Sequence, residues 1–232
     1  MKLAVPDMIS NSYFPAIAAI ELGFFKREGL DVALELIFPV DKAYAALRDG
    51  AVDFVGGSAH SALAAFPQWQ GVKLLCAQAL AARKIDGFWA NGMGAEVAVR
   101  RGVGSIVLDV RRGEGPKPCF NYTMAALATT DRLIEASPDT ATAAIRAIIN
   151  TQSALKRDLA LAAAVGRKLF PPSEAELIAE LIRRDLPYYD PAISETFVAG
   201  MNRFARDLEI LTGDVPYLQI VAPQLRNEAA GR

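Results

Sequence analysis

The chain has few of the residues on which metal, redox and disulfide chemistry depend. Its 232 residues include two cysteines, Cys76 and Cys119, and one histidine, His60. Two cysteines so far apart cannot form the disulfide framework of a small secreted domain, and they lack the CxxC spacing of zinc and thiol redox motifs. One histidine excludes a metal site built from several histidines. The sequence therefore predicts neither a metal nor a cofactor.

An excess of positive charge is also missing. The chain has 25 Lys and Arg against 26 Asp and Glu, which gives a net charge of −1. Proteins that bind nucleic acid need a basic excess to pair with phosphates, so nucleic acid is excluded as the main partner. The 52% of hydrophobic and 22% of charged residues are ordinary for a soluble globular protein. A chain of 232 residues is long enough to form two lobes.

Long apolar runs and an export signal are absent as well. No apolar run reaches the roughly 18–20 residues of a transmembrane helix. Met1-Lys2 leads directly into Leu3-Ala4-Val5, which indicates a first strand rather than a signal peptide. We therefore expect either a cytoplasmic protein or the mature form of an exported one, and the sequence alone does not decide between them.

The most informative stretch runs from Ala43 to Ala59, AYAALRDGAVDFVGGSA. The spacing of its first apolar residues predicts the end of an amphipathic helix, which Asp49-Gly50 terminates because Gly enters a left-handed cap without steric cost. Val52 to Val55 predict a short buried strand. Gly56-Gly57-Ser58 then predict a small-residue loop that lets the backbone approach a ligand closely.

A similar pattern follows in AQALAARKIDGFWANGMG. Aligning Leu47 with Leu80 places Asn91 opposite Ser58, so both predicted loops carry a small hydrogen-bonding side chain. We interpret this as an internal repeat, although chance similarity between two alanine-rich helix ends is the alternative.

The first forty residues predict an α/β unit. Leu3–Val5 form a strand, Pro15 stands at the start of a helix over 16–22 with Gly23 as its cap, and residues 31–37 form a second strand. Ligands in such sheets gather at the carboxyl ends of the strands. The polar loop 10–13 lies at such an end, and the free N–H groups of the following helix favour an anionic group.

Several segments resemble periplasmic substrate-binding proteins of ABC importers, in the sulfonate/taurine/nitrate and thiamine-pyrimidine (NMT1/THI5-like) branch. The most specific pieces are GFFKREGLDV and ALRDGAVDF, and NYTMAALATTDRLIEASPDTATAAIRAI is similar to the family's return from lobe two. The resemblance implies a type II periplasmic-binding fold of two α/β lobes with a ligand between them.

The resemblance also implies a division of the chain. Residues 1–77 and 119–232 would form lobe one with its C-terminal helices, and 78–118 would be what remains of lobe two. That remnant is about 40 residues, whereas independent domains typically have ~100–150. Either a section near 78–80 is missing from this sequence or the protein carries a deletion. We favour the former, because a lobe without its first strand–helix units would expose a large apolar face.

Beyond residue 129 the sequence predicts helices that act as scaffold. Pro138 opens one with Ser137 as N-cap. We expect further helices over 155–169, 174–186 (capped by Ser173) and 194–211, and a surface tail after Pro216.

The candidate ligand-binding residues lie in the predicted loops of both lobes. They are Asn11, Ser12, Tyr13, Ser58, His60, Trp89, Asn91, Asn121 and Tyr122. Serine and asparagine donors suit a sulfonate or carboxylate, whereas Tyr13 and Trp89 also suit a flat ring such as a pyrimidine. The sequence leaves these ligand classes open.

The resemblance implies a monomeric solute-binding protein, not an enzyme, that captures a small organic ligand in the periplasm and delivers it to an ABC permease. The alternative is a biosynthetic enzyme of the THI5-like or menaquinone-pathway type, because the same fold carries both. The pyrimidine synthases have a cysteine-rich cluster and a His/Lys pair. Here the cysteines are isolated, Gly57 stands where the lysine would be expected, and a general base would have to be His60 or Glu96.

Overall fold

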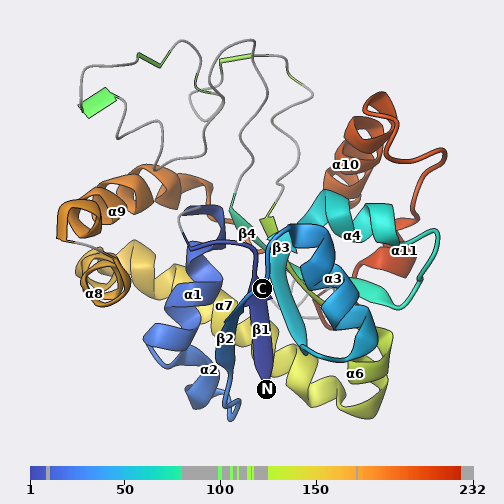
Figure 1. Ribbon diagram of the computed structural model, residues 1–232, viewed down its shortest axis with the longest axis horizontal. Coiled ribbons are helices and arrows are strands. Elements are labelled where there is room, and N and C mark those ends of the chain that lie inside the picture. The colour runs from blue at the N-terminus through green and yellow to red at the C-terminus, as the bar shows by residue number, and fades with distance from the viewer. Residues whose placement is uncertain are drawn as a thin grey trace.

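The computed structural model describes residues 1–8, 11–79, 125–170 and 172–225, with short pieces at 99–100, 105–106, 109, 114–115 and 117. The described elements form three layers, with helices on both faces of one sheet (Figure 1). This confirms the predicted α/β class.

The sheet has five strands in the order β2-β1-β3-β5-β4. Their bounds are β1 Lys2–Val5, β2 Ala33–Leu36, β3 Phe54–Ser58, β4 Val72–Ala79 and β5 Ala125–Thr130. β1 is parallel to β2 and β3, while β5 runs antiparallel to β3 and β4. β3 and β5 are buried at every position, because helices cover both faces.

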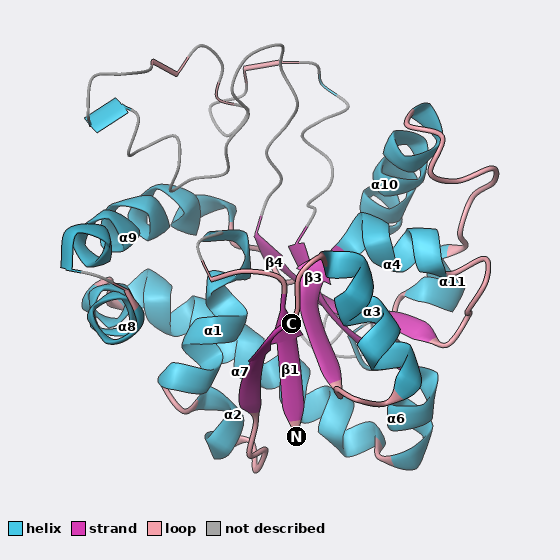
Figure 2. Cartoon of the chain, viewed as in Figure 1, coloured by secondary structure: helices cyan, strands magenta, loops and turns pink. Residues whose placement is uncertain are grey.

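The helices divide between the two faces, as Figure 2 shows in cyan around the magenta sheet. On one side are α1 Phe14–Glu21, α2 Phe24–Arg27, α7 Pro138–Arg157, α8 Ala160–Leu169 and α9 Pro172–Asp185. On the other are α3 Val40–Asp49, α4 Ala59–Ala65, α6 Asp131–Ala136, α10 Glu195–Asp207 and α11 Tyr217–Ile220. Short 3-10 turns, η1 Asn11–Tyr13 and η4 Leu186–Tyr188, precede α1 and follow α9. No helix in the described ranges is both long and apolar enough to cross a bilayer.

The glycine pair after Phe54 lies in a strand, so the predicted loop is wrong. Gly56 and Gly57 pair with Leu127 and Ala126 of β5, and β3 continues to Ser58. A Cβ at Gly57 would lie 3.3 Å from Cε2 of Tyr44. The close approach that the glycines permit is therefore made by helix α3 of the protein itself.

One predicted helix end is confirmed, and two neighbouring predictions differ from the structure. Gly50 caps α3 in the left-handed conformation (φ 78°), as expected. Gly23 is also left-handed (φ 72°), but α2 begins directly after it where a turn was expected. β2 is shorter than the predicted strand 31–37.

Two predictions for the C-terminal helices are wrong at particular residues. α7 begins at Pro138, but the hydroxyl of Ser137 bonds that of Thr140 at 2.7 Å and does not cap the backbone. A single helix over 155–169 does not form, because the chain is extended at Asp158, whose carboxylate then accepts from the N–H of Ala160 at 2.9 Å. Asp158 thus separates α7 from α8.

The remaining helices start and stop close to expectation. α9 begins at Pro172, which removes Ser173 as its N-cap. α10 starts after Ser194, whose hydroxyl accepts from the N–H of Phe197, and it ends at Asp207 rather than at residue 211.

Residues 217–225, the described part of the chain after Pro216, do not form a surface tail. α11 follows, and Val221 bridges Leu74 of β4 while the N–H of Ala222 donates to the carbonyl of Leu74 at 3.0 Å. Ile220, Val221 and Ala222 are buried. Their apolar side chains complete the core beside β4, which the composition of this short segment did not reveal.

Candidate functional site

The carboxyl ends of β1, β3 and β4 meet at one edge of the sheet. β4 is parallel to β3, because both are antiparallel to the strand between them. Ser58 pairs with Ala125, and Ala125 pairs with Ala79. The chain therefore leaves β4 and returns into β5 directly beside Ser58. This is the edge at which ligands collect in α/β sheets.

The turn η1 brings Tyr13 to the same edge. It follows β1 and packs against β4 and β5. Burial, and then the charge of Asp7, raise the pKa of Tyr13 to about 12, so its hydroxyl stays protonated at neutral pH. Ser12 is partly buried beside it, and the side chain of Asn11 lies outside the described part of the structure.

Ser58 is buried and held by two hydrogen bonds. The hydroxyl of Tyr44 donates to its carbonyl at 3.0 Å, and its own hydroxyl lies 2.8 Å from that of Ser61. Burial, and then the neighbouring Tyr13, raise the pKa of Tyr44. The two tyrosines are therefore close, and together they join η1, α3 and β3 at one place.

His60 lies in the first turn of α4, two residues beyond Ser58. Its Nδ1 atom is buried and has no hydrogen-bond partner. Its ring stands edge-on to that of Phe204 in α10, with centroids 5.9 Å apart and planes at 64°. Burial lowers the pKa of His60 and the charge of Asp41 opposes this, so the ring is uncharged at neutral pH.

The structure thus places three predicted residues, Tyr13, Ser58 and His60, around one strand edge, with Ser12 beside them. Trp89, Asn91, Asn121 and Tyr122, as well as Glu96, lie outside the described residues. Their contact with a ligand stays a prediction. The internal repeat and a second lobe over residues 78–118 also stay predictions.

Sequence reasoning missed three residues of this edge, namely Tyr44, Ser61 and Phe204. Tyr44 lies in the predicted helix that ends before Gly50, and Phe204 is more than a hundred residues from His60. The spacing of Ser58 and Ser61 across a strand–helix junction was the one local signal, because residues three apart can meet in a first helical turn.

The described residues offer no site for a metal. No group of three or more His, Cys, Asp or Glu comes together within them. Cys76 is buried in β4, and burial raises the pKa of its thiol to about 12, which makes it unreactive at neutral pH. His60 Nδ1 makes no bond to Ser58 or Ser61, so these residues do not form a serine–histidine pair through that atom.

Comparison with known proteins gives a family match over part of the chain and a fold over its whole length. The family model described as "NMT1/THI5 like" matches residues 10–92, which include Tyr13, Ser58 and His60. No curated protein sequence matches significantly.

Three solved structures resemble the chain over nearly its whole length. A protein from Bordetella bronchiseptica RB50 has 19% identity and a TM-score of 0.73, over 100% of this chain and 98% of that one. The ligand-binding component of an ABC-type import system from Staphylococcus aureus, with zinc bound, has 12% identity and a TM-score of 0.67, over 99% of this chain and 98% of that one. The periplasmic aliphatic sulphonate-binding protein SsuA from Escherichia coli has 12% identity and a TM-score of 0.61, over 97% of this chain and 98% of that one. At these identities the likeness establishes the fold.

Proposed function

Because the chain carries an NMT1/THI5-like region and has the fold of periplasmic binding proteins, as its sequence predicted, we propose that it is a solute-binding protein of an ABC importer. It captures a small organic ligand and presents it to a membrane permease. The proposed ligand is a sulfonate, a nitrate-like anion or a compound with a pyrimidine-type ring.

One observation carries this proposal. Strands β4 and β5 are hydrogen-bonded neighbours. β4 ends at Ala79 and β5 begins at Ala125, and Ala125 pairs with Ser58. A lobe formed by the segment between them would be tethered by two adjacent strands directly over Tyr13, Ser58 and His60. Hinge closure about two such strands would bury a ligand between the lobes.

The side chains at the edge are suited to binding rather than to chemistry. Tyr13 and Tyr44 stay protonated, and His60 stays uncharged. His60 is the chain's one histidine, and its buried Nδ1 has no partner that would orient it as a base. This supports the non-enzymatic function. The periplasm as the protein's location and a monomer as its form are part of the same proposal.

The test is to measure binding before and after removal of two side chains predicted to contact the ligand, Ser58 at the end of β3 and Asn91 in the second predicted loop. The purified protein is incubated with a small-molecule extract, and retained compounds are identified by mass spectrometry after denaturation. Wild-type protein retains one compound. The double variant Ser58→Ala, Asn91→Ala loses it while staying folded, and the lost Ser58–Ser61 bond costs about 1–3 kcal/mol of stability.

One control variant and one refuting outcome make the result decisive. Thr142→Ser keeps the same class of side chain on α7, where Thr142 bonds only the carbonyl of Pro138, and it retains the compound. Equal retention by wild type and the double variant would show that the compound binds elsewhere and would remove the proposed site.

A further inference from the structure

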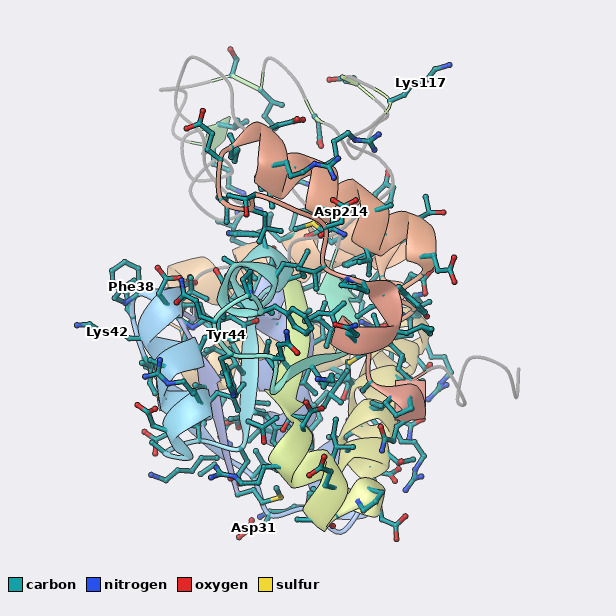
Figure 3. All side chains as sticks on the ribbon, turned by 90° about the vertical axis from the view of Figure 1, so that its right-hand side faces the viewer. Asp31, Phe38, Lys42, Tyr44, Lys117 and Asp214 are labelled. Atoms are coloured by element: carbon teal, nitrogen blue, oxygen red, sulfur yellow. The ribbon has the colours of Figure 1, made fainter. Side chains whose placement is uncertain are left out.

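The backbone of Ser58 is fixed from two sides. Ser58 pairs with Ala125 at the start of β5, and its carbonyl accepts a hydrogen bond from the hydroxyl of Tyr44 at 3.0 Å. Tyr44 points from α3 into the body of the protein, whereas Phe38 and Lys42 near the start of α3 project outward (Figure 3). The freedom left to Ser58 is rotation about its Cα–Cβ bond, which sets the direction of its hydroxyl.

The hydroxyl of Ser58 does not cap the helix that it precedes. A serine in this place usually accepts a hydrogen bond from a backbone N–H of the first turn, but the Ser58 side chain accepts no such bond in α4. Its hydroxyl lies instead 2.8 Å from that of Ser61, three residues further on. Both serines are only 6% exposed, so water competes little for this bond. Ser61 therefore sets the direction in which the Ser58 hydroxyl points.

The two hydroxyls together keep one proton for a further partner. Each serine hydroxyl has one proton and can accept two hydrogen bonds. One proton lies between the two oxygens, whichever of them donates it, and the other proton is left over. Ser58 can thus donate to a ligand, or accept from one, while its bond to Ser61 persists. Binding then leaves neither buried hydroxyl without a partner, which would be costly.

We propose that Ser61 is a positioning residue of the binding site, which orients the hydroxyl of Ser58 toward the ligand and does not contact the ligand itself. This rests on the proposed binding function and adds to it a residue that acts through another. If the role of Ser61 were only structural, its substitution would change stability alone. Positioning also changes the rotamer of Ser58 and the affinity for the ligand.

A pair of variants of nearly equal shape isolates the hydroxyl. Ser61→Thr and Ser61→Val both add volume, so any strain from the larger side chain is common to them. Ser61→Thr keeps the bond to Ser58, and Ser61→Val removes it. Ser61→Ala removes the hydroxyl without adding volume, and it replaces Ser61→Val if position 61 does not accept a larger side chain.

Two measurements are made on each variant. The rotamer of Ser58 is obtained from three-bond couplings to its Hβ protons in protein labelled with ¹³C,¹⁵N-serine, and Ser58→Ala identifies the Ser58 signal by its loss. Affinity is measured by calorimetry with ethanesulfonate, nitrate and cytosine, one probe for each proposed ligand class, at a temperature where every variant is folded.

The expected results separate the two variants. Wild-type protein and Ser61→Thr show one Ser58 rotamer, and their affinities for the probe that binds agree within about twofold. Ser61→Val and Ser61→Ala lose the single rotamer, because the Ser58 hydroxyl no longer has the partner that holds it. They bind the same probe about tenfold more weakly.

A second hydroxyl pair supplies a matched control. Ser137 precedes α7 without capping it, and its hydroxyl lies 2.7 Å from that of Thr140, three residues further on. Ser137 follows α6, the helix that leaves the sheet at the opposite edge from Ser58. Thr140→Val removes a hydroxyl from this pair and leaves the affinity for the probe unchanged.

Several outcomes would overturn the proposal. More than one Ser58 rotamer in wild-type protein, or a single rotamer in Ser61→Val and Ser61→Ala, would show that Ser61 does not orient Ser58. Weaker binding by Ser61→Val with an unchanged rotamer would mean that Ser61 contacts the ligand directly. Equal affinities of Ser61→Val and Ser61→Thr would show that the direction of the Ser58 hydroxyl does not matter for binding. If wild-type protein binds none of the three probes, the proposed ligand classes fail, and the rotamers still decide whether Ser61 orients Ser58.

Discussion

Substituting Gly57 by alanine tests how closely α3 packs on the strand that leads to the site. An added Cβ would lie 2.8 Å from Cγ1 of Val55, 3.2 Å from Cγ2 of Val40 and 3.3 Å from Cε2 of Tyr44. The contact with Val55 lies within β3, while those with Val40 and Tyr44 push α3 away from the strand. Overpacking of this kind costs about 1–3 kcal/mol.

The same structure supplies a matched control. A Cβ at Gly213 would meet no atom within 4 Å, and Gly213 lies outside the left-handed region. Gly213→Ala should therefore be neutral or stabilise by up to about 1 kcal/mol, because it restricts the unfolded chain.

The assay is urea unfolding followed by circular dichroism, with thermal unfolding as a second measure. Gly57→Ala should lower the free energy of unfolding by about 2 kcal/mol and the melting temperature by roughly 4–8 °C. The slope against urea should not change. If Gly57→Ala is no less stable than Gly213→Ala, the tight contact between α3 and β3 is refuted, and with it the reading of Gly57 as a packing residue.

Three further predictions follow from individual residues. Tyr44→Phe removes a buried hydrogen bond and should cost about 1–3 kcal/mol in urea unfolding, whereas Tyr217→Phe, which loses a partly exposed bond, should cost less than about 1 kcal/mol; a reversed order would contradict the assigned burial. Asn202→Ala removes both hydrogen bonds to the backbone of Val215 and should cost about 2 kcal/mol, with faster proteolysis of the loop after α10; unchanged proteolysis would count against this clamp. Because the pKa of Tyr13 is raised to about 12 in the folded protein, its hydroxyl ionises first in the unfolded chain as the pH rises above 10. The stability that Tyr13 contributes is therefore fully present below pH 10 and is lost as the pH rises to about 12. Tyr13→Phe should lose less stability than wild type between pH 9 and 11, and an equal loss would contradict the burial of Tyr13.

Local chemistry accounts for what the sequence predicted of the fold. Gly50 stops α3 because its backbone adopts a positive φ, and Ser194 caps α10 through a side-chain bond three residues on. Such features depend on neighbours in the chain. The separation of α7 from α8 at Asp158 also has a local cause, but the apolar spacing across it is continuous and hides it.

Predictions failed where distant segments decide the outcome. The burial of Val221 depends on an edge position beside Leu74, which no property of the last residues indicates. In the site, Tyr13, Ser58 and His60 could be named because they follow strand ends. Phe204 could not, because its contact with His60 is made between helices far apart in sequence.

The central claim is that the protein holds a small organic ligand, and native mass spectrometry of the freshly purified protein tests it most directly. The sequence corresponds to 24.9 kDa. The account predicts a native mass that exceeds the denatured mass by that of one small molecule, which the Ser58→Ala, Asn91→Ala variant lacks. A native mass equal to the denatured one, in a protein that also takes up no compound from a small-molecule extract, would contradict it.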